Sequence, residues 1–225
     1  MSTTSVTLSN SDRVRATISL VLPEMMGSAQ ALWDHPRLPE VYPRFLRLMH
    51  GVIRASVPLM EAALDQTQRL ATRDPVAAAM SAYFLKHIPE ERGHDDWLLQ
   101  DLQELGIDPT TATDVPPSPL VAELVGAQYY WMFHFHPVAL LGYIAVVEGY
   151  PPQPDAVTEL ARRSGYSAQA FRTLAKHAHL DRRHSADLDT LLDSLPLRPE
   201  HENVITLSAL RTVYLFGQLM QEIVH

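Results

Sequence analysis

Two segments of the chain carry the same arrangement of two histidines and one acidic residue. They read His87-x3-Glu91-x2-His94 and His177-x3-Asp181-x2-His184. In an α-helix, positions i, i+4 and i+7 leave one narrow strip of the surface, at about 0°, 40° and −20° around the axis. We therefore expect each segment to present two imidazoles and one carboxylate towards a single point, as a transition-metal ion requires.

The pattern is rare for this composition. With 11 histidines and 26 acidic residues in 225, one match is expected about 0.06 times per chain, and this chain has two. Cysteine is absent, which excludes disulfides, thiolate zinc sites and cysteine nucleophiles. Any metal must therefore be held by histidine, aspartate and glutamate, which suit iron, manganese or zinc.

Two further acidic residues lie in largely apolar surroundings. Glu148 ends an apolar run, and Glu61 lies within a helical pattern. Helical di-iron proteins use two carboxylate-x-x-His pairs and one carboxylate from each of two other helices. The candidates for the pairs and for the single carboxylates are Glu91/His94, Asp181/His184, Glu148 and Glu61.

These residues belong to helices that are separated by short turns. Apolar residues recur at helical spacing, no segment alternates with the period of a strand, and proline or glycine marks most ends. The predicted fold is all-α, with residues 1–225 in a single domain and a turn-rich linker over 107–119. We expect helices over about residues 11–33, 42–72, 74–105, 120–134, 137–148, 155–164, 167–192 and 202–224.

Composition and charge narrow the class of partner. The net charge is −8 with no basic run, so nucleic-acid binding is not expected. No apolar run approaches the roughly 20 residues of a membrane span, and the first residues lack the features of a signal peptide. We expect a cytoplasmic enzyme with a small-molecule substrate and no membrane partner. A homodimer is one possible assembly.

At the residues named above, the sequence resembles the heme-oxygenase-like diiron oxidases, which are also described as iron-containing redox enzymes. The resemblance covers about residues 74–192. It lies in a Glu/His pair on one core helix, a lone glutamate further along the chain, and His-x3-Asp-x2-His on a third core helix. These positions are Glu91 and His94, Glu148, and His177, Asp181 and His184.

The resemblance implies a heme-oxygenase-like bundle of about seven helices without heme. It also implies two Fe(2+) ions with O2 as co-substrate. Such an enzyme would pass through a peroxo-diferric intermediate and oxidise a small amino- or carboxylic-acid metabolite. Our hypothesis for the ligands gives one iron His94, Glu148 and His177, gives the other Asp181, His184 and Glu61, and places Glu91 between them.

One position departs from the family pattern. Some members place a bridging glutamate seven residues before the histidine of the Glu/His pair, and this chain has His87 there. Either Glu91 bridges instead, with Glu90 as the less favoured choice, or His87 alters the first site. The role of His87 is therefore open between ligand, hydrogen-bond partner of a ligand, and surface residue.

Two other functions are open. A helical HD-type metal phosphohydrolase would use the adjacent pair His94-Asp95, with His50 or His87 before it and Asp181 after it. This assignment leaves Glu148, His177 and His184 without a role. A metal-free member of the same fold, such as a thiaminase-like hydrolase or a small-molecule-binding protein, would satisfy the buried polar groups among themselves.

Overall fold

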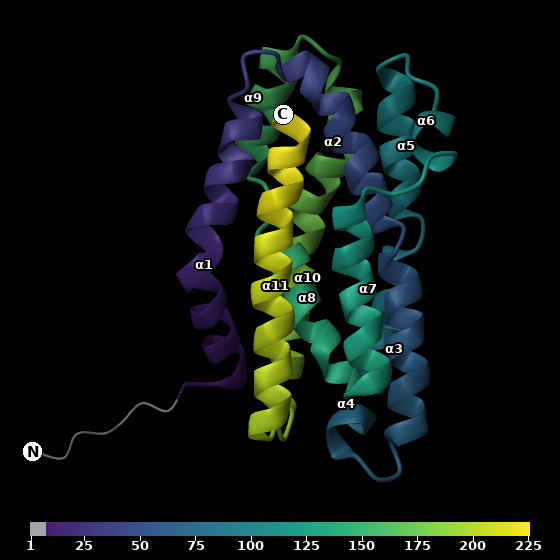
Figure 1. Cartoon of the computed structure of the whole chain (residues 1–225), viewed down its shortest axis with the longest axis vertical. Coiled ribbons are helices and arrows are strands. Elements are labelled where there is room, and N and C mark those ends of the chain that lie inside the picture. Colours follow the sequence, from purple (N-terminus) through teal and green to yellow (C-terminus); the bar gives the residue numbers. More distant parts are fainter. Residues whose placement is uncertain (1–7) are drawn as a thin grey trace, which may run out of the picture.

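The computed structural model describes residues 8–225, and in this range the chain forms helices and no strands. The prediction of an all-α fold is therefore confirmed. The long helices run side by side along the long axis of the molecule (Figure 1). In chain order the elements are α1 (Asn10–Trp33), α2 (Leu38–Ile53), α3 (Ser56–Leu70), α4 (Pro75–Glu91), α5 (His94–Glu104), α6 (Thr110–Thr113), α7 (Pro119–His134), η1 (Pro137–Ala139), α8 (Leu140–Val147), α9 (Pro154–Ser164), η2 (Ala168–Phe171), α10 (Arg172–Ser194) and α11 (Pro199–Val224).

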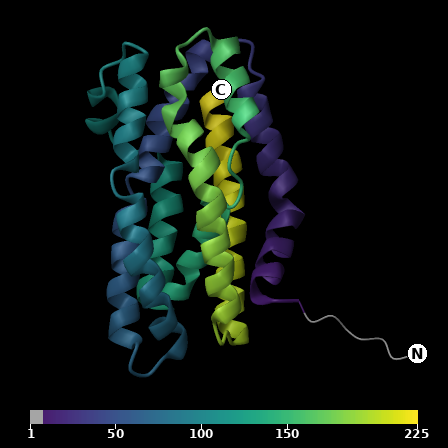
Figure 2. The ribbon, with the colours of Figure 1, turned by 180° about the vertical axis from the view of Figure 1, so that it is seen from behind.

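The two long C-terminal helices occupy the middle of the bundle. α11 lies in front in Figure 1 with α1 packed along it, and Figure 2 shows α10 from the opposite side, in front of α11. α3 packs against α4, and α5 packs against both α2 and α10. None of the helices within residues 8–225 has the length and apolarity that a membrane crossing requires.

Buried apolar side chains form two clusters. The larger includes Phe84 of α4 and Leu141 of α8, and the smaller includes Tyr42 of α2 and Phe171 of η2. Phe45 of the smaller cluster lines a cavity together with Val147, which packs against the larger one. The polar centre described below therefore lies where the two clusters meet.

The helix expected over residues 42–72 is divided into α2 and α3. The division falls at Arg54 and Ala55, four residues before Pro58. A proline ring clashes with the carbonyl group four residues earlier and removes one helical hydrogen bond. Pro58 is accommodated in the first turn of α3, and the chain ends α2 just before it.

The helix expected over residues 74–105 is also divided. Its start is as predicted, because the Asp74 carboxylate accepts hydrogen bonds from the backbone N–H groups of Val76 and Ala77. It ends at Glu91, since Arg92 is extended and Gly93 adopts a left-handed conformation with φ of 84°. Glu91 is consequently the last residue of α4, and α5 begins three residues later, at His94.

Two contacts fix the end of α8, which is followed by Glu148. A side chain at Gly142 would overlap the Ile205 carbonyl oxygen, so α8 lies directly against the α11 backbone. Arg15 of α1 donates a hydrogen bond of 2.8 Å to the Ala145 carbonyl and forms an ion pair of 2.8 Å with Asp189 of α10. α1 thereby holds the end of α8 against α10.

Candidate metal centre

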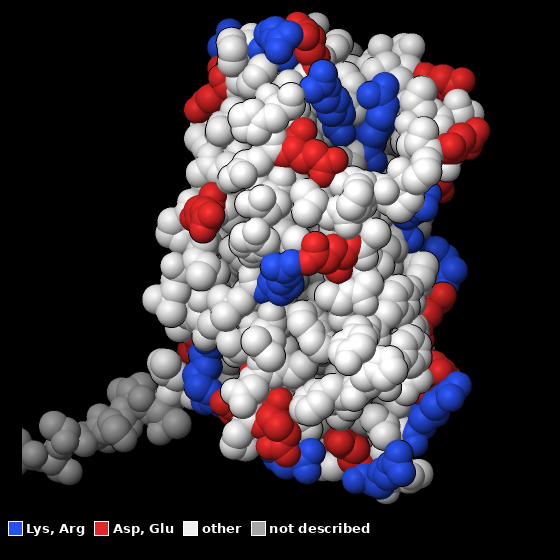
Figure 3. Space-filling model, in the orientation of Figure 1, with Lys and Arg blue, Asp and Glu red and all other residues white. Residues whose placement is uncertain are grey.

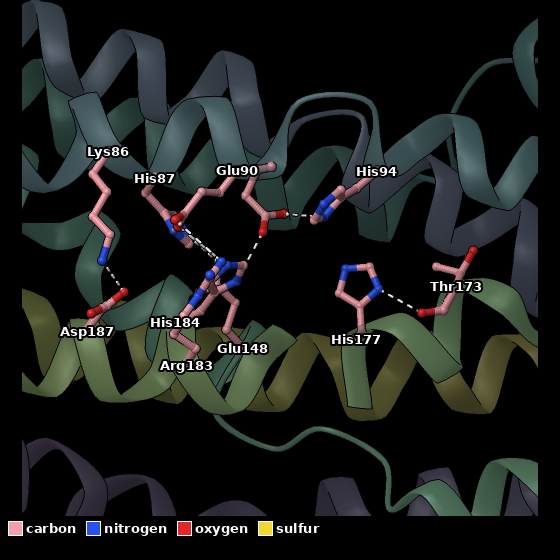
Figure 4. Close-up of polar contacts among 11 residues, drawn as sticks. Lys86, His87, Glu90, His94, Glu148, Thr173, His177, Arg183, His184 and Asp187 are labelled. Atoms are coloured by element: carbon pink, nitrogen blue, oxygen red, sulfur yellow. Dashed lines mark hydrogen bonds and ion pairs between the residues drawn. The ribbon is translucent and has the colours of Figure 1, made fainter. Parts of the chain in front are cut away.

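Polar side chains from four helices meet in the interior of the bundle (Figure 4). Six of the seven are at most 9% exposed, and Glu61 is the one sequence-predicted ligand that is not among the seven. The group consists of His87 and Glu91 from α4, His94 from α5, Glu148 from the end of α8, and His177, Asp181 and His184 from α10.

These side chains form two sets of ligand atoms, and within each set the atoms lie within 4.8 Å of one another. The first set is His87, Glu91, Glu148 and His184, and the second is Glu91, His94 and His177. Glu91 is common to both. Its Oε1 lies 3.2 Å from His184 Nδ1, and its Oε2 lies 3.0 Å from His94 Nδ1. The two carboxylate oxygens therefore face different sets, as those of a bridging carboxylate do.

Many of the buried polar atoms at the centre have no hydrogen-bond partner among the described residues. They are Glu91 Oε1, His94 Nδ1, Glu148 Oε2, Asp181 Oδ1 and both ring nitrogens of His184. Each such atom costs about 1–3 kcal/mol, and native proteins contain few of them. A polar network that satisfied itself would not leave so many unpaired. Lone pairs that converge without partners fit two metal ions.

One imidazole of the second set is oriented by the backbone. His177 Nδ1 donates a hydrogen bond of 2.9 Å to the Thr173 carbonyl, which leaves the Nε2 lone pair free to bind a metal. The His177 ring meets that of His94 edge-on, with centroids 5.2 Å apart. His94 in turn stacks on Trp97 at 3.9 Å. The second set is thus held by packing on one side and by a carbonyl group on the other.

The first set is held mainly by contacts among its own members. His87 Nε2 lies 2.9 Å from Glu148 Oε1, and the His87 ring stacks on Tyr83 with centroids 5.1 Å apart. The rings of His87 and His184 meet edge-on at 4.5 Å. His87 is 1% exposed, so the structure places it among the candidate ligands and not at the surface.

Glu90 lies outside both sets. Its Oε2 is 3.6 Å from both His87 Nδ1 and His184 Nε2, and its Oε1 is 3.4 Å from Arg183. The guanidinium of Arg183 competes for this carboxylate. Glu90 therefore contacts the imidazoles from the rim of the centre.

Burial sets the protonation of the centre. It lowers the pKa of His184 to about 4, so that this imidazole is neutral at pH 7 and free to bind a metal. Burial, together with repulsion from Glu148 and Glu91, raises the pKa of Asp181 to about 9. Burial also raises the pKa of Glu148. The centre is short of positive charge, which divalent cations would supply.

Asp181 belongs to neither set and faces a cavity of about 130 Å³ beside them. The polar part of the cavity wall consists of Ser56, Tyr150, Thr173 and side chains of the centre, and no lysine or arginine lines it. Its apolar wall consists of Phe45, Met49, Ile53, Leu98, Val147, Pro151, Pro152 and Leu174. A small, mainly apolar molecule fits this space.

The expectation that each repeated segment addresses one point is wrong. On α10, His177 and His184 are seven residues apart, about 10.5 Å along the axis, and they belong to different sets. In the first segment the break at Gly93 separates His87 from His94 in the same way. Each segment therefore serves both sets, and Glu148 lies with His184 and not with His94 as hypothesised.

The structure does not bring Glu61 to the centre. Its side chain is 50% exposed and pairs with Arg92 at 2.9 Å. Neither Asp95 nor His50, which an HD-type phosphohydrolase would use, belongs to any ligand set within residues 8–225.

Sequence reasoning also missed residues that position the ligands. Asp101 is fully buried on α5, and its carboxylate accepts a hydrogen bond of 3.0 Å from the Thr173 N–H at the start of α10. The sequence feature that could have indicated it is an acidic residue on the apolar face of a helix, one turn from Leu98 and next to Leu102. Arg15, which joins α8 to α10, left no such signal.

A third group of polar side chains lies at the other end of α4 and contains Asp74, His136 and His201. His136 Nδ1 accepts a hydrogen bond from the Val138 N–H, and its Nε2 lies 3.2 Å from Asp74. The Arg198 guanidinium adjoins His201 at 3.0 Å. Because both His136 nitrogens are engaged and a cation is already present, this group joins helix ends and does not resemble the metal centre.

Comparison with known proteins agrees with this geometry. The sequence model of one protein family, described as iron-containing redox enzyme, matches residues 52–217. A domain of unknown function with a heme oxygenase-like fold from Shewanella denitrificans superposes with a TM-score of 0.74 at 14% identity, over 94% of this chain and 88% of that chain.

Two other solved structures share the fold. A CADD-like protein of unknown function from Nostoc punctiforme has a TM-score of 0.66 at 14% identity, over 94% of this chain and 97% of that chain. A TenA homolog from Pseudomonas syringae pv. tomato has a TM-score of 0.64 at 10% identity, over 91% of both chains. No curated protein matches the sequence. The heme oxygenase-like fold predicted from the sequence is confirmed.

Proposed function

The chain belongs to the family of iron-containing redox enzymes, and from this premise we propose that it is a dioxygen-dependent, non-heme diiron oxidase or oxygenase acting on a small molecule. One observation carries the proposal. Two sets of buried and largely unpaired ligand atoms share the carboxylate of Glu91. Carboxylates that offset charge and neutral imidazoles are the donors that suit iron.

Each residue has a role in this proposal. Glu91 would bridge the two ions, with three further ligands in the first set and two in the second. Asp181 would bind as an additional carboxylate after losing its proton. Ferrous ions held in this way would supply the electrons for the reduction of dioxygen. The remaining ligands are His87, Glu148 and His184 for one ion and His94 and His177 for the other.

The protein around the ions selects and orients the substrate. The apolar wall of the 130 Å³ cavity keeps bulk water from the centre and admits a molecule with an apolar body. Its polar wall carries the carboxyl groups of Glu91, Glu148 and Asp181 and the imidazole of His177, and no lysine or arginine. Because no lysine or arginine is there to pair with a carboxylate, the group that both predicted classes (amino acids and carboxylic acids) carry, the cavity favours a substrate whose polar group is an amine.

Anaerobic loading with Fe(II) followed by exposure to air tests the proposal. The unaltered chain should bind two ions and consume dioxygen, with a change in its absorption spectrum. His184→Ala and Glu148→Ala should abolish that change, Glu90→Ala should weaken it, and Glu61→Ala is the matched control that should leave it intact. Two tightly bound ions in His184→Ala would contradict the assignment.

The same titration separates the alternatives. A metal phosphohydrolase would bind metal and ignore dioxygen. A metal-free hydrolase or binding protein of the same fold would bind no ferrous ion at all. A straight-chain amine, the carboxylic acid of equal length and the corresponding amino acid, each offered to the loaded protein, test this preference by the dioxygen that each consumes.

A further inference from the structure

A second cavity lies between α2, α6 and the segment that leads into α7, on the face shown in Figure 3. Its volume is about 260 Å³, and three arginines line it, two on α2 and one directly after its last residue. Two basic side chains stand side by side over α2 at the edge of a hollow (Figure 3). The three arginines are Arg44, Arg47 and Arg54.

The arginines of this cavity differ from most others in the chain. Eleven of the sixteen arginines form ion pairs with carboxylates, and three of the remaining five line this one cavity. Arg44 and Arg54 make no hydrogen bond or ion pair with any residue in 8–225. Arg47 donates only its Nε, to Thr111 Oγ1 at 3.1 Å. In a chain of net charge −8, such a concentration of unpaired guanidinium groups attracts anions.

The positions of the arginines indicate the form of the anion. Residues 44, 47 and 54 share one face of α2 and span about 15 Å along its axis. A guanidinium offers paired donors that match phosphate oxygens, and a phosphate monoester carries about −1.5 to −2 charges at pH 7. One acidic residue, Glu222, also lines the cavity, and it accepts a hydrogen bond of 2.8 Å from Ser118.

The rest of the wall is apolar. Apart from Thr111 and Ser118, it consists of Leu48, Gly51, Ala112, Val115, Pro116, Pro117, Val121 and Ile223, so an organic group attached to the phosphate would be covered. We propose that this cavity binds an organic phosphate, with the phosphate on the arginines of α2 and the organic group against these side chains.

The phosphate cavity is separate from the cavity at the metal centre. Phe45, Met49 and Ile53, on the opposite side of α2, line the latter, so the helix forms a wall between the two. The inference does not depend on the presence of iron or on the proposed oxidase activity.

Calorimetric titration of the full chain with phenyl phosphate, both metal-free and iron-loaded, tests the inference. We expect saturable one-to-one binding in both forms. Arg44→Gln and Arg47→Gln should weaken it by about tenfold or more, as the loss of a charged hydrogen bond does, whereas Glu222→Gln should strengthen it. Arg73→Gln is the matched control, because Arg73 is exposed, lies outside the cavity and has no ion pair among the described residues.

Several results would overturn the inference. Equal affinity in Arg44→Gln, Arg47→Gln and the control would show that the arginines do not bind the anion, provided that circular dichroism shows all variants folded. Binding only to the iron-loaded chain would place the phosphate on the metal. Equal affinity for benzoate would remove the preference for phosphate, and binding of a glutamate-rich peptide but not of phenyl phosphate would assign the cavity to an acidic protein segment.

Discussion

The two halves of the metal centre carry the same spacing of histidine and acid on different backbones. In the first, the helix ends at Glu91 and restarts at His94 after a left-handed glycine. In the second, α10 continues without interruption from Arg172 to Ser194. Both acids lie between two histidines in sequence, yet Glu91 belongs to both ligand sets and Asp181 belongs to neither.

The difference shows that backbone geometry decides which acid is shared. At the end of α4, the carboxylate of Glu91 lies between imidazoles on both sides, and those contacts outweigh burial and lower its pKa. On the unbroken α10, Asp181 forms no ion pair with a histidine among the described residues, and burial raises its pKa to about 9. Identical spacing has therefore given one acid that is ready to bind metal and one that must first lose a proton.

The largest effect expected is the loss of both ions from Glu91→Ala, because its carboxylate is the only member common to the two sets within the described residues. His87→Ala and His94→Ala should each lose one ion, the former from the first set and the latter from the second. Iron per chain after anaerobic loading and desalting measures this. Retention of one ion by Glu91→Ala would show that the acids are not shared in the way proposed.

Asp181 should make the metal-free chain less stable as pH rises. Its carboxyl has an ordinary pKa of 3.8 and a pKa of about 9 in the folded chain, so the folded state binds more protons between these values. The free energy of unfolding of the metal-free chain should therefore fall as pH rises from about 4 to about 9. Asp181→Asn removes this ionisation and should stabilise the metal-free chain by about 1–3 kcal/mol near neutral pH.

Urea unfolding of the metal-free chain at about pH 5 and about pH 8 measures that change. The gain from Asp181→Asn should be larger at the higher pH, while iron binding weakens. Glu61→Gln, an exposed acid on α3, is the control and should change neither quantity. A gain that does not depend on pH would show that the carboxyl is not protonated in the folded chain.

The sequence predicted the members of the candidate centre better than their grouping. Helical spacing indicated His87, Glu91 and His94 in one segment and His177, Asp181 and His184 in another, and the structure brings all six together with Glu148. It could not reveal that the chain turns at Gly93 or that Glu61 faces solvent, because both depend on how α3, α4 and α5 pack. Glu148 was found because an acid ended an otherwise apolar run. The cytoplasmic location and the homodimer stay predictions.

A smaller effect is expected at the break itself. Gly93 has φ of 84°, and a Cβ there would meet only Asp96 Oδ2 at 3.8 Å, so the cost of Gly93→Ala is conformational. An L-residue in this region costs about 1–2 kcal/mol.

Gly165, with φ of 73° and open space around it at the end of α9, gives a matched control. Both alanine variants should lose similar stability, but only Gly93→Ala should weaken the ion held by His94 and His177. Equal iron binding would mean that the break is not needed to place His94.

The smallest effect expected concerns the contact that joins the two halves. Burial raises the pKa of Asp101 from 3.8 to about 6, against the hydrogen bond from Thr173, so its ionisation makes the folded chain less stable as pH rises between these values. Asp101→Asn removes that cost and keeps an oxygen acceptor for the Thr173 N–H, but it loses the favourable charge at the start of α10, worth about 0.3–1 kcal/mol. Because the two changes oppose each other, the net difference at neutral pH should be under about 1 kcal/mol. The part of the pH dependence that arises between about pH 4 and about pH 6 should disappear.

Thermal unfolding in this pH range measures the change. The control is Asp101→Ala, which removes the acceptor as well and should be clearly destabilised at every pH. If Asp101→Asn were as unstable as Asp101→Ala, the charge and not the acceptor would be what holds α10 against α5.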